Sequence, residues 1–597
     1  MVLVAEKTPD KTDFVRSVTG KIWTLRSCDE RQATSLAQKF DLPEIVARIL
    51  SSRGITSEIA EDFLSPSLRS SLPDPCHLID MEKAAQRLAQ AILSQENVVI
   101  FGDYDVDGAT SSAILKRFFK MAGLETKIYI PDRVEEGYGP NIPALKKLRE
   151  EGADIIITVD CGTVSFEPLE KAKSFGLETI VIDHHLGAET MPEAIAVVNP
   201  NRIDETSPHR NLAACGISFL LVVAINRILR EKNFYNQRSE PDIFSLLDLV
   251  ALGTVCDVMS LTGLNRAYVN QGLKVMAARR NLGLTVLADI ARLEGTPSTY
   301  HAGFLLGPRI NAGGRIGEAG LGARLLTTDD PDEAREIALK LDRLNEERRA
   351  IEITVMDEAI MQAENLSQTS PVIIVAGEGW HQGVIGIVAG RIKEKFGRPA
   401  AVIALDGELG KASARSITGV DFGAAVAAAR SKGLLIAGGG HAMAAGFTVE
   451  KAKIQELQNF LNERLGPAIE KFSSQKKLII ETILSPSGVS PDLAESISSL
   501  EPFGVGNPEP RIAIKNARLL KSEQVGIDHI SCIIGQGGAF ADPKIKLKAI
   551  AFRSLGTPLG KALITSQGKD IHLAGKIKLN HWQGKSRAEF HIEDVVI

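Results

Sequence analysis

The stretch VVIFGDYDVDG, from Val98 to Gly108, decides the fold of this 597-residue chain. Its first four residues predict a buried β-strand, because short apolar runs rich in β-branched residues are typical of parallel sheets. The acidic run DYDVDG follows at once and places Asp103, Asp105 and Asp107 at the carboxyl end of that strand. Open parallel sheets bind their ligands at this end. The stretch therefore predicts an α/β domain with an acidic functional cluster at one sheet edge.

Three further apolar runs predict the neighbouring strands, at residues 127–130, 154–159 and 179–182. One helix-length segment separates each pair of strands. The segments AAQRLAQAIL and SAILKRFFKMAG, on either side of the first strand, carry apolar residues at helical spacing. This alternation predicts a doubly wound parallel sheet covered by helices.

Acids also follow the later strands. Asp160 comes directly after one run, and the triplet Asp183, His184 and His185 comes directly after the next. A fourth apolar stretch, LVALGTVCDV, delivers Asp257 and is counted as another acidic strand end. Oxygen ligands with one imidazole suit manganese or magnesium better than zinc, and shared carboxylates suit a pair of ions. Two such ions about 3.5–4 Å apart would stabilise the attacking and leaving oxygens of a phosphate ester.

Two simpler readings of these acids compete with the metal site. DYDVDG is similar to the start of a calcium-binding EF-hand loop, but the twelfth position is Ile114 instead of Glu, and a strand precedes the run. A single Asp at a strand end is often only a helix N-cap. Four acidic ends in one domain favour the metal site over both alternatives.

Composition and the pattern of apolar residues divide the rest of the chain into segments. Residues 331–368 contain no Gly and are rich in helix formers, so they predict one long helix between two domains. A second α/β block follows, and after about Lys476 strands with Gly-containing turns predict a β-barrel. We predict five segments: an N-terminal extension and helical lead-in at 1–80, the acidic sheet domain at 81–329, the connecting helix at 330–368, the smaller α/β domain at 369–470 and the barrel at 471–597.

Composition limits the partners and the compartment. The net charge is −5, so a nucleic-acid ligand needs a local basic surface; from Lys476 onward 16 Lys and Arg face 12 Asp and Glu. The six cysteines lie far apart without a C-x-x-C pair, which fits a reducing compartment. The segment MVLVAEKTPDKTDF lacks the apolar core of a signal peptide, and no apolar run reaches the roughly 20 residues that span a bilayer. We expect a cytoplasmic protein without a membrane partner.

The acidic motifs resemble the DHH phosphoesterase superfamily, whose successive motifs are similar to DYDVDG, TVDCG, the DHH triplet and ALGTVCDV. The resemblance implies manganese or magnesium, as two ions, and catalytic roles for Asp160, His184 and His185. The metal ligands that it implies are Asp103, Asp105, Asp107, Asp160, His184 and Asp257. The chain departs from the inorganic pyrophosphatases of the superfamily at Phe101, where those enzymes have a histidine.

Six further motifs resemble the RecJ family of single-strand-specific exonucleases and extend the likeness over nearly the whole chain. They are GPRINAGGRIGEAG, LNEERRAIE, GWHQGVIGIVAGRI, KASARSITGVDF, GGGHAMAAGF and EPFGVGNPEP. By this likeness the second block is a DHH-associated domain and the barrel an OB-fold. The resemblance implies a 5′-to-3′ exonuclease that hydrolyses single-stranded DNA to 5′ mononucleotides in DNA repair and recombination. Single-strand-binding protein and a helicase are the expected protein partners.

Arginine forks, hydroxyls and Gly-flanked amides supply phosphate-binding chemistry in these motifs. The predicted phosphate-binding residues are Arg133, Arg309, Asn311, Arg315, Ser413, Arg415, Gly439, Gly440 and His441. A lone Arg is more often a solvated residue, and a lone His is often a packed core residue.

Two other functions stay open. The first is a DHH phosphoesterase acting on oligoribonucleotides, cyclic dinucleotides or pyrophosphate, which the locally basic barrel disfavours. The second is a non-catalytic DNA-binding replication factor, which the complete set of ligand residues disfavours.

Overall fold

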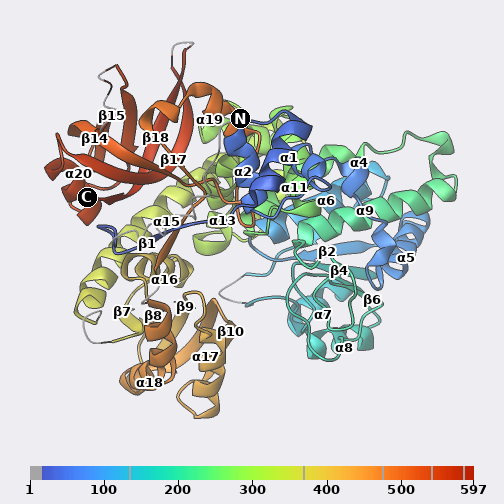
Figure 1. Ribbon diagram of the computed structural model, residues 1–597. Helices are drawn as coiled ribbons and strands as arrows, with labels where there is room; N and C mark the ends of the chain where they lie inside the picture. Colours follow the sequence, from blue (N-terminus) through green and yellow to red (C-terminus); the bar gives the residue numbers. More distant parts are fainter. Residues whose placement is uncertain are drawn as a thin grey trace. The chain divides into compact units, whose positions relative to one another are not determined.

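The computed structural model describes residues 16–597 apart from 133–135, 367–369, 474–475, 539–541, 543 and 583–584. These residues form two compact units, shown with their elements labelled in Figure 1. The larger unit comprises 66–469 with 502–507, and the smaller comprises 16–65, 470–501 and 508–597.

A five-stranded parallel sheet lies at the centre of the larger unit, in the order β3-β2-β4-β5-β6. Its strands are β2 (Val98–Gly102), β3 (Lys127–Tyr129), β4 (Ile155–Val159), β5 (Glu178–Ile182) and β6 (Ala196–Val198). One face packs on α5 (Met81–Ser94), α6 (Val106–Met121) and α9 (Ala214–Glu231), and the other on α7 (Ile142–Glu150) and α8 (Phe166–Ser174). Four strands lie where the sequence predicts them, and β6 is an addition. The predicted doubly wound sheet is confirmed.

The stretch LVALGTVCDV is not a strand, and the prediction of a strand end there was wrong. It forms helix α10 (Leu247–Cys256), with Asp257 as the C-cap. Residues 247–254 are all buried, because α10 packs against α6, α9 and α11 (Gly263–Ala277). A helix buried on every side has the same continuous apolar run as a buried strand, so periodicity does not separate the two.

The predicted long helix is α15 (Pro331–Leu366), which leads into a second five-stranded sheet of order β10-β11-β9-β8-β7. Only β7 and β8 run parallel in this sheet. The strands are β7 (Ile373–Glu378), β8 (Ala400–Asp406), β9 (Leu409–Arg415), β10 (Ala437–His441) and β11 (Ala444–Glu450). Helices α15 and α16 (Gln382–Phe396) cover one face, whereas α17 (Phe422–Ser431) and α18 (Ile454–Ser473) cover the other.

The smaller unit is built on a six-stranded sheet of order β13-β14-β15-β16-β18-β17, and pairing of β14 with β17 closes it into a barrel. The strands are β13 (Thr482–Leu484), β14 (Ile512–Val525), β15 (His529–Gln536), β16 (Leu547–Ala551), β17 (Asp570–Trp582) and β18 (Lys585–Val596). The predicted fold class, two α/β domains joined by a long helix and followed by a barrel, is therefore confirmed.

The N-terminal segment belongs to the same unit as the barrel. Strand β1 (Ile22–Leu25) pairs in parallel with β12 (Lys477–Ile480). The buried Trp23 indole donates to Asp594 Oδ2 at 2.9 Å, and the buried Arg53 guanidinium pairs with Glu481 at 2.8 Å.

The cysteines and the apolar helices can be compared with what the composition predicts. All six cysteines are free thiols, in keeping with their wide spacing in the sequence. Among the described residues, no helix combines the length and the apolar character needed to cross a membrane.

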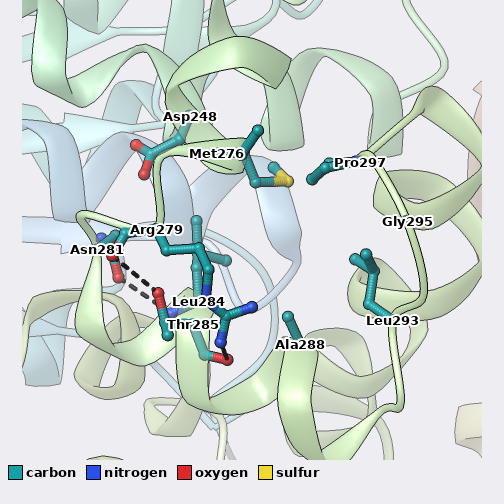
Figure 2. Close-up of a pocket in the computed structure, with 11 residues that line it drawn as sticks. Asp248, Met276, Arg279, Asn281, Leu284, Thr285, Ala288, Leu293, Gly295 and Pro297 are labelled. Carbon is teal, nitrogen blue, oxygen red and sulfur yellow. Dashed lines mark hydrogen bonds between the residues drawn. The ribbon is translucent and has the colours of Figure 1, made fainter.

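A small cavity of about 80 Å³ lies beside α10, α11 and α12 (Leu282–Ile290) (Figure 2). None of the predicted site residues lines it. Asp248, which is only 1% exposed, is among the residues that do, and its carboxylate accepts a hydrogen bond from Leu249 N at 2.8 Å. Burial raises the pKa of Asp248 to about 7, although Leu249 N and the charge of Arg117 oppose the shift.

We predict that Asp248→Asn stabilises the protein more at pH 8 than at pH 5. The unfolded chain ionises this carboxyl near pH 4, but the folded chain keeps its proton up to about pH 7. The stability that Asp248 contributes is therefore complete below pH 4 and is lost as the pH rises to 7. The gain at pH 8 should exceed the gain at pH 5 by about 3 kcal/mol, because the folded-state pKa of about 7 lies two units above pH 5 and each unit is worth about 1.4 kcal/mol.

Thermal unfolding midpoints of the wild type and the variant at both pH values measure this difference. Asp289→Asn, which changes an exposed carboxylate on α12, is the control. An equal gain at both pH values would contradict the raised pKa.

Candidate metal centre

The acidic loop joins β2 to α6 and is held by main-chain N–H groups. Asp105 is the N-cap of α6, and its Oδ1 accepts from Asp107 N at 2.9 Å and from Gly108 N at 3.1 Å. The buried Asp107 carboxylate accepts from Ala214 N at 2.7 Å and from Cys215 N at 2.9 Å, at the start of α9. Helix N-termini stabilise negative charge, so two helix ends orient these carboxylates.

Asp160 follows β4 in a strained main-chain conformation. Its φ is 61°, in the left-handed region that costs a non-Gly residue of the order of 1–3 kcal/mol. Its N–H donates to Ile182 O at 3.0 Å, and its carbonyl accepts from Tyr138 Oη at 2.9 Å. These two contacts hold the Asp160 carboxylate at the sheet edge despite the strain.

Asp183 organises the DHH triplet through its own hydrogen bonds. Its Oδ1 accepts from His184 N at 2.8 Å, from His185 N at 3.2 Å and from His185 Nδ1 at 2.7 Å. Its Oδ2 accepts from Thr163 N at 3.0 Å. Asp183 therefore fixes both imidazoles.

The predicted ligands converge on His184. Its Nε2 lies 3.2 Å from Asp160 Oδ1, 3.5 Å from Asp257 Oδ2 and 3.8 Å from Asp107 Oδ2. Three ligand groups have donor atoms within 4.8 Å of one another: Asp160, His184 and His185; Asp107, His184 and Asp257; and Asp103, Asp105 and Asp160. The structure thus brings all six predicted metal ligands together, and His185 with them.

The donor atoms fit a metal ion. Asp160 Oδ1, His184 Nε2 and Asp257 Oδ2 are buried, and none has a hydrogen-bond partner among the described residues. Leaving buried polar atoms unsatisfied costs about 1–3 kcal/mol each, so the arrangement calls for a cation. Carboxylate oxygens with imidazole nitrogen suit Mn²⁺ or Mg²⁺. The superfamily histidine position, Phe101, is fully buried in β2 and is not part of the cluster.

Burial and mutual repulsion shift the pKa values at the centre. Burial is the main cause for the carboxyls, and neighbouring acids reinforce it: the pKa of Asp160 lies well above its usual range, and that of Asp257 is about 8. Burial lowers the pKa of His184, which keeps the imidazole neutral and able to bind a metal. Burial also opposes a charge on His185, but its hydrogen bond to Asp183 outweighs this and raises the pKa to about 9.

Sequence reasoning missed three residues that hold this centre. Asn199 Nδ2 donates to His185 O at 2.8 Å, and Asn201 Nδ2 donates to His184 O at 2.6 Å. Their signal is the run VVNPN, which places both amides at the carboxyl end of β6. Tyr138 lies edge-on to His185, with ring centroids 6.0 Å apart, and no sequence pattern marks it.

The predicted phosphate-binding residues of the second block share one region of its sheet. Ser413 and Arg415 lie on β9, and Gly439 and His441 lie in register with them on β10, each across one residue of β11. Alternate strand residues point to the same face, so these four positions share a face, and Gly440 belongs to the opposite one. Arg415 Nη1 donates to Ser413 Oγ at 3.2 Å.

The other predicted phosphate ligands have different environments. On α13 (Gly307–Ile316), Arg309 Nε donates to Asp342 at 2.8 Å, and Arg315 Nη1 donates to a main-chain carbonyl of α16 at 3.0 Å. Asn311 is half-buried on the same helix. Arg133 lies outside the described residues. The phosphate-binding role of these four residues stays a prediction.

Three segments of the chain match known domain families. Residues 97–254 match the N-terminal domain of the DHH family, residues 369–466 match the DHHA1 domain, and residues 480–594 match the RecJ OB domain. These matches fall on the parallel sheet, on the second sheet and on the barrel.

Curated relatives match most of the chain. It is 33% identical to the single-stranded-DNA-specific exonuclease RecJ of Bacillus subtilis over 96% of this chain and 71% of that protein. It is 34% identical to the Salmonella typhimurium protein of the same name over 96% and 99%. A crystal structure of RecJ with Mn²⁺ from Thermus thermophilus superposes with a TM-score of 0.78 at 27% identity, covering 96% of this chain and 79% of that one.

We predict that metal binding at this centre releases protons. The raised pKa values of Asp160 and Asp257 mean that a metal must displace protons at neutral pH, so its apparent affinity should fall at least about tenfold from pH 8 to pH 6. Calorimetric titration with Mn²⁺ in two buffers of different ionisation enthalpy measures the protons released. Asp257→Asn should release fewer. Equal heats in both buffers would show that the carboxyls are already ionised.

Proposed function

Since the chain belongs to the RecJ family of single-stranded-DNA-specific exonucleases, we propose that it removes nucleotides from the 5′ end of single strands as 5′ mononucleotides. The chain is a metal-dependent hydrolase specific for single-stranded DNA. The convergence of unsatisfied Asp160, His184 and Asp257 atoms supports the assignment of the catalytic centre. Polarity and product are the proposed parts.

The metal is Mn²⁺ or Mg²⁺, because structures of the Thermus thermophilus relative contain each ion and the carboxylate-rich donor set suits both. Two ions are proposed, since three overlapping ligand groups are present. Asp103, Asp105, Asp107, Asp160, His184 and Asp257 would hold them. When bound, such a pair activates water and stabilises charge on the scissile phosphate.

His185 is the proposed proton donor to the leaving 3′ oxygen. Its pKa of about 9 keeps the imidazole protonated at neutral pH, and Asp183 engages Nδ1, so Nε2–H is the proton available for transfer. Asp183 and Asn199 hold the ring and its main chain in place. Tyr138 supports the same arrangement by binding the Asp160 carbonyl.

The proposed pocket for the terminal 5′ phosphate is formed by Ser413, Arg415, Gly439 and His441. Gly440 lets β10 pair closely with β11 beside it. A guanidinium and a hydroxyl provide strong donors for phosphate oxygens, and glycine lets the phosphate approach the main chain. Holding the 5′ phosphate there would place the next phosphodiester at the metals and would set the polarity. We propose that further phosphates of the strand, nearer the metal domain, are bound by Arg309, Asn311, Arg315 and Arg133.

The barrel is proposed to bind the single strand beyond the cleavage site. OB-folds bind single strands through basic grooves and base stacking, and residues 480–594 match such a domain. By family membership we also propose a role in DNA repair and recombination, with single-strand-binding protein and a helicase as partners. A cytoplasmic location is proposed, where six free thiols stay reduced.

The rival functions have less support. A small-substrate DHH enzyme needs no strand-binding barrel, yet this chain carries one. A non-catalytic DNA-binding factor needs no complete ligand set, yet all six ligands are present in three groups that overlap at Asp160 and His184. Comparing hydrolysis of long single strands with that of dinucleotides and pyrophosphate separates these functions from the nuclease.

We predict that Asp160→Ala reduces Mn²⁺-dependent cleavage of single-stranded DNA to background while single-strand binding persists. Asp160 contributes to two of the three ligand groups, so its loss removes a ligand from both of them. Release of mononucleotides and filter binding measure the two activities. Asp154→Ala, at the opposite end of the same strand segment, is the control. Retained cleavage would refute the metal centre.

We predict that Arg415→Ala removes the preference for a 5′ phosphate over a 5′ hydroxyl. Charge-assisted hydrogen bonds contribute about 1.5–3 kcal/mol, so the preference should fall about 10- to 100-fold. Initial rates on matched 5′-phosphorylated and 5′-hydroxyl strands measure this ratio. Arg430→Ala, an exposed site on α17, should keep the wild-type ratio. An unchanged ratio in Arg415→Ala would place the phosphate elsewhere.

A further inference from the structure

Three glycines, Gly314, Gly383 and Gly386, connect the metal loop to the proposed phosphate pocket; we call them the glycine relay. Gly314 lies on α13 against the acidic loop. A Cβ added there would lie 2.6 Å from the carbonyl oxygen of Tyr104, the residue between Asp103 and Asp105. Ordinary contacts of this kind begin at 3.4 Å, so only glycine lets α13 touch the main chain of the loop.

The second contact joins α13 to α16. A Cβ on Gly383, in the first turn of α16, would lie 2.3 Å from Arg315 O. In return, Arg315 Nη1 donates to Gly383 O at 3.0 Å. The main chains of α13 and α16 therefore contact each other with no side chain between them, and the Arg315 guanidinium links them by its hydrogen bond.

The third contact joins α16 to the phosphate-binding strand. A Cβ on Gly386 would lie 3.1 Å from Ser413 Oγ and 3.2 Å from Arg415 Nη2. Gly390, one further turn along this side of α16, has nothing within 4 Å of its added Cβ. Close approach is thus confined to the positions that face α13 and the pocket.

We propose that the glycine relay sets the distance between the 5′-phosphate pocket and the metal ligands, and so fixes the released fragment at one nucleotide. This inference rests on the proposed function, because it requires the terminal phosphate at Ser413 and Arg415. Helices in direct main-chain contact transmit position with little slack, since packed interiors have few voids. A shift of about 1 Å in a reacting group costs about 100-fold in rate, so such spacing matters.

The relay also gives Arg315 a role as a positioning residue. Its Nη1 donates to the Gly383 carbonyl, and this hydrogen bond joins the helix beside the metal loop to the helix beside the pocket. A loss of Arg315 would loosen the spacing without adding bulk. A methyl group on Gly383 would instead force the two helices apart by about 1 Å, the difference between its 2.3 Å approach and ordinary contact.

The test compares Gly383→Ala with Gly390→Ala, a matched change on the same helix. Both proteins digest a 5′-phosphorylated single strand with Mn²⁺, and the lengths of the first products are resolved on a sequencing gel. We expect Gly383→Ala to release dinucleotides and longer fragments and to lose at least tenfold of its 5′-phosphate preference. Gly390→Ala should release mononucleotides with the wild-type preference. Mn²⁺ affinity and single-strand affinity should stay at wild-type values in both.

Arg315→Ala keeps the test decisive if Gly383→Ala fails to fold. We expect it to give mixed product lengths with an unchanged thermal midpoint, which a purely structural role would not produce. Mononucleotide products with wild-type phosphate preference from Arg315→Ala and from folded Gly383→Ala would overturn the inference and leave the proposed function standing. A wild type that starts at the 3′ end, or ignores the 5′ phosphate, would refute the proposed function and the inference with it.

Discussion

Electrostatic repulsion among carboxylates gathered around one imidazole is the constraint on which the larger unit depends. Carboxylates this close together raise the pKa values of one another's carboxyl groups, and the low dielectric of a buried site strengthens the effect. The structure opposes the repulsion with fixed dipoles: the N-termini of α6 and α9 orient Asp105 and Asp107. It also accepts a strained main chain at Asp160. A bound cation would offset the repulsion among the carboxylates that remains, so the site favours a divalent ion.

Fixed hydrogen bonds also determine the charge of each histidine in the DHH triplet. The Asp183 carboxylate accepts hydrogen bonds from its two histidine neighbours and from Thr163, so it orients the two imidazoles. Two adjacent histidines thereby acquire opposite protonation: His184 is neutral because it is buried, and His185 is charged because Asp183 binds it. On the proposed function, this one triplet would supply both a metal ligand and an acid.

The sequence alone predicted the parts of the site that follow strands. Apolar runs ending in acids located Asp103, Asp105, Asp107, Asp160 and the DHH triplet, because strand ends of a parallel sheet meet at one edge. Asp257 was placed correctly at the site but on the wrong element, since a helix buried on all sides reads as a strand. Asn199 carried a usable signal after β6. By contrast, no motif predicts that Arg309 pairs with Asp342 or that Arg315 donates to a carbonyl of α16, because these contacts depend on packing between distant segments.

The parallel pairing of β1 with β12 has a consequence for biosynthesis. Ile22 pairs with Lys477, which the ribosome adds 455 residues later. At about 5–20 residues per second this delay lasts roughly 20 to 90 seconds. Residues 66–469 are all synthesised during that interval, whereas the partners of Trp23 and Arg53, Asp594 and Glu481, are added only after it. The segment translated early is therefore completed late, and the nascent chain must keep an apolar strand from pairing wrongly until its partner emerges.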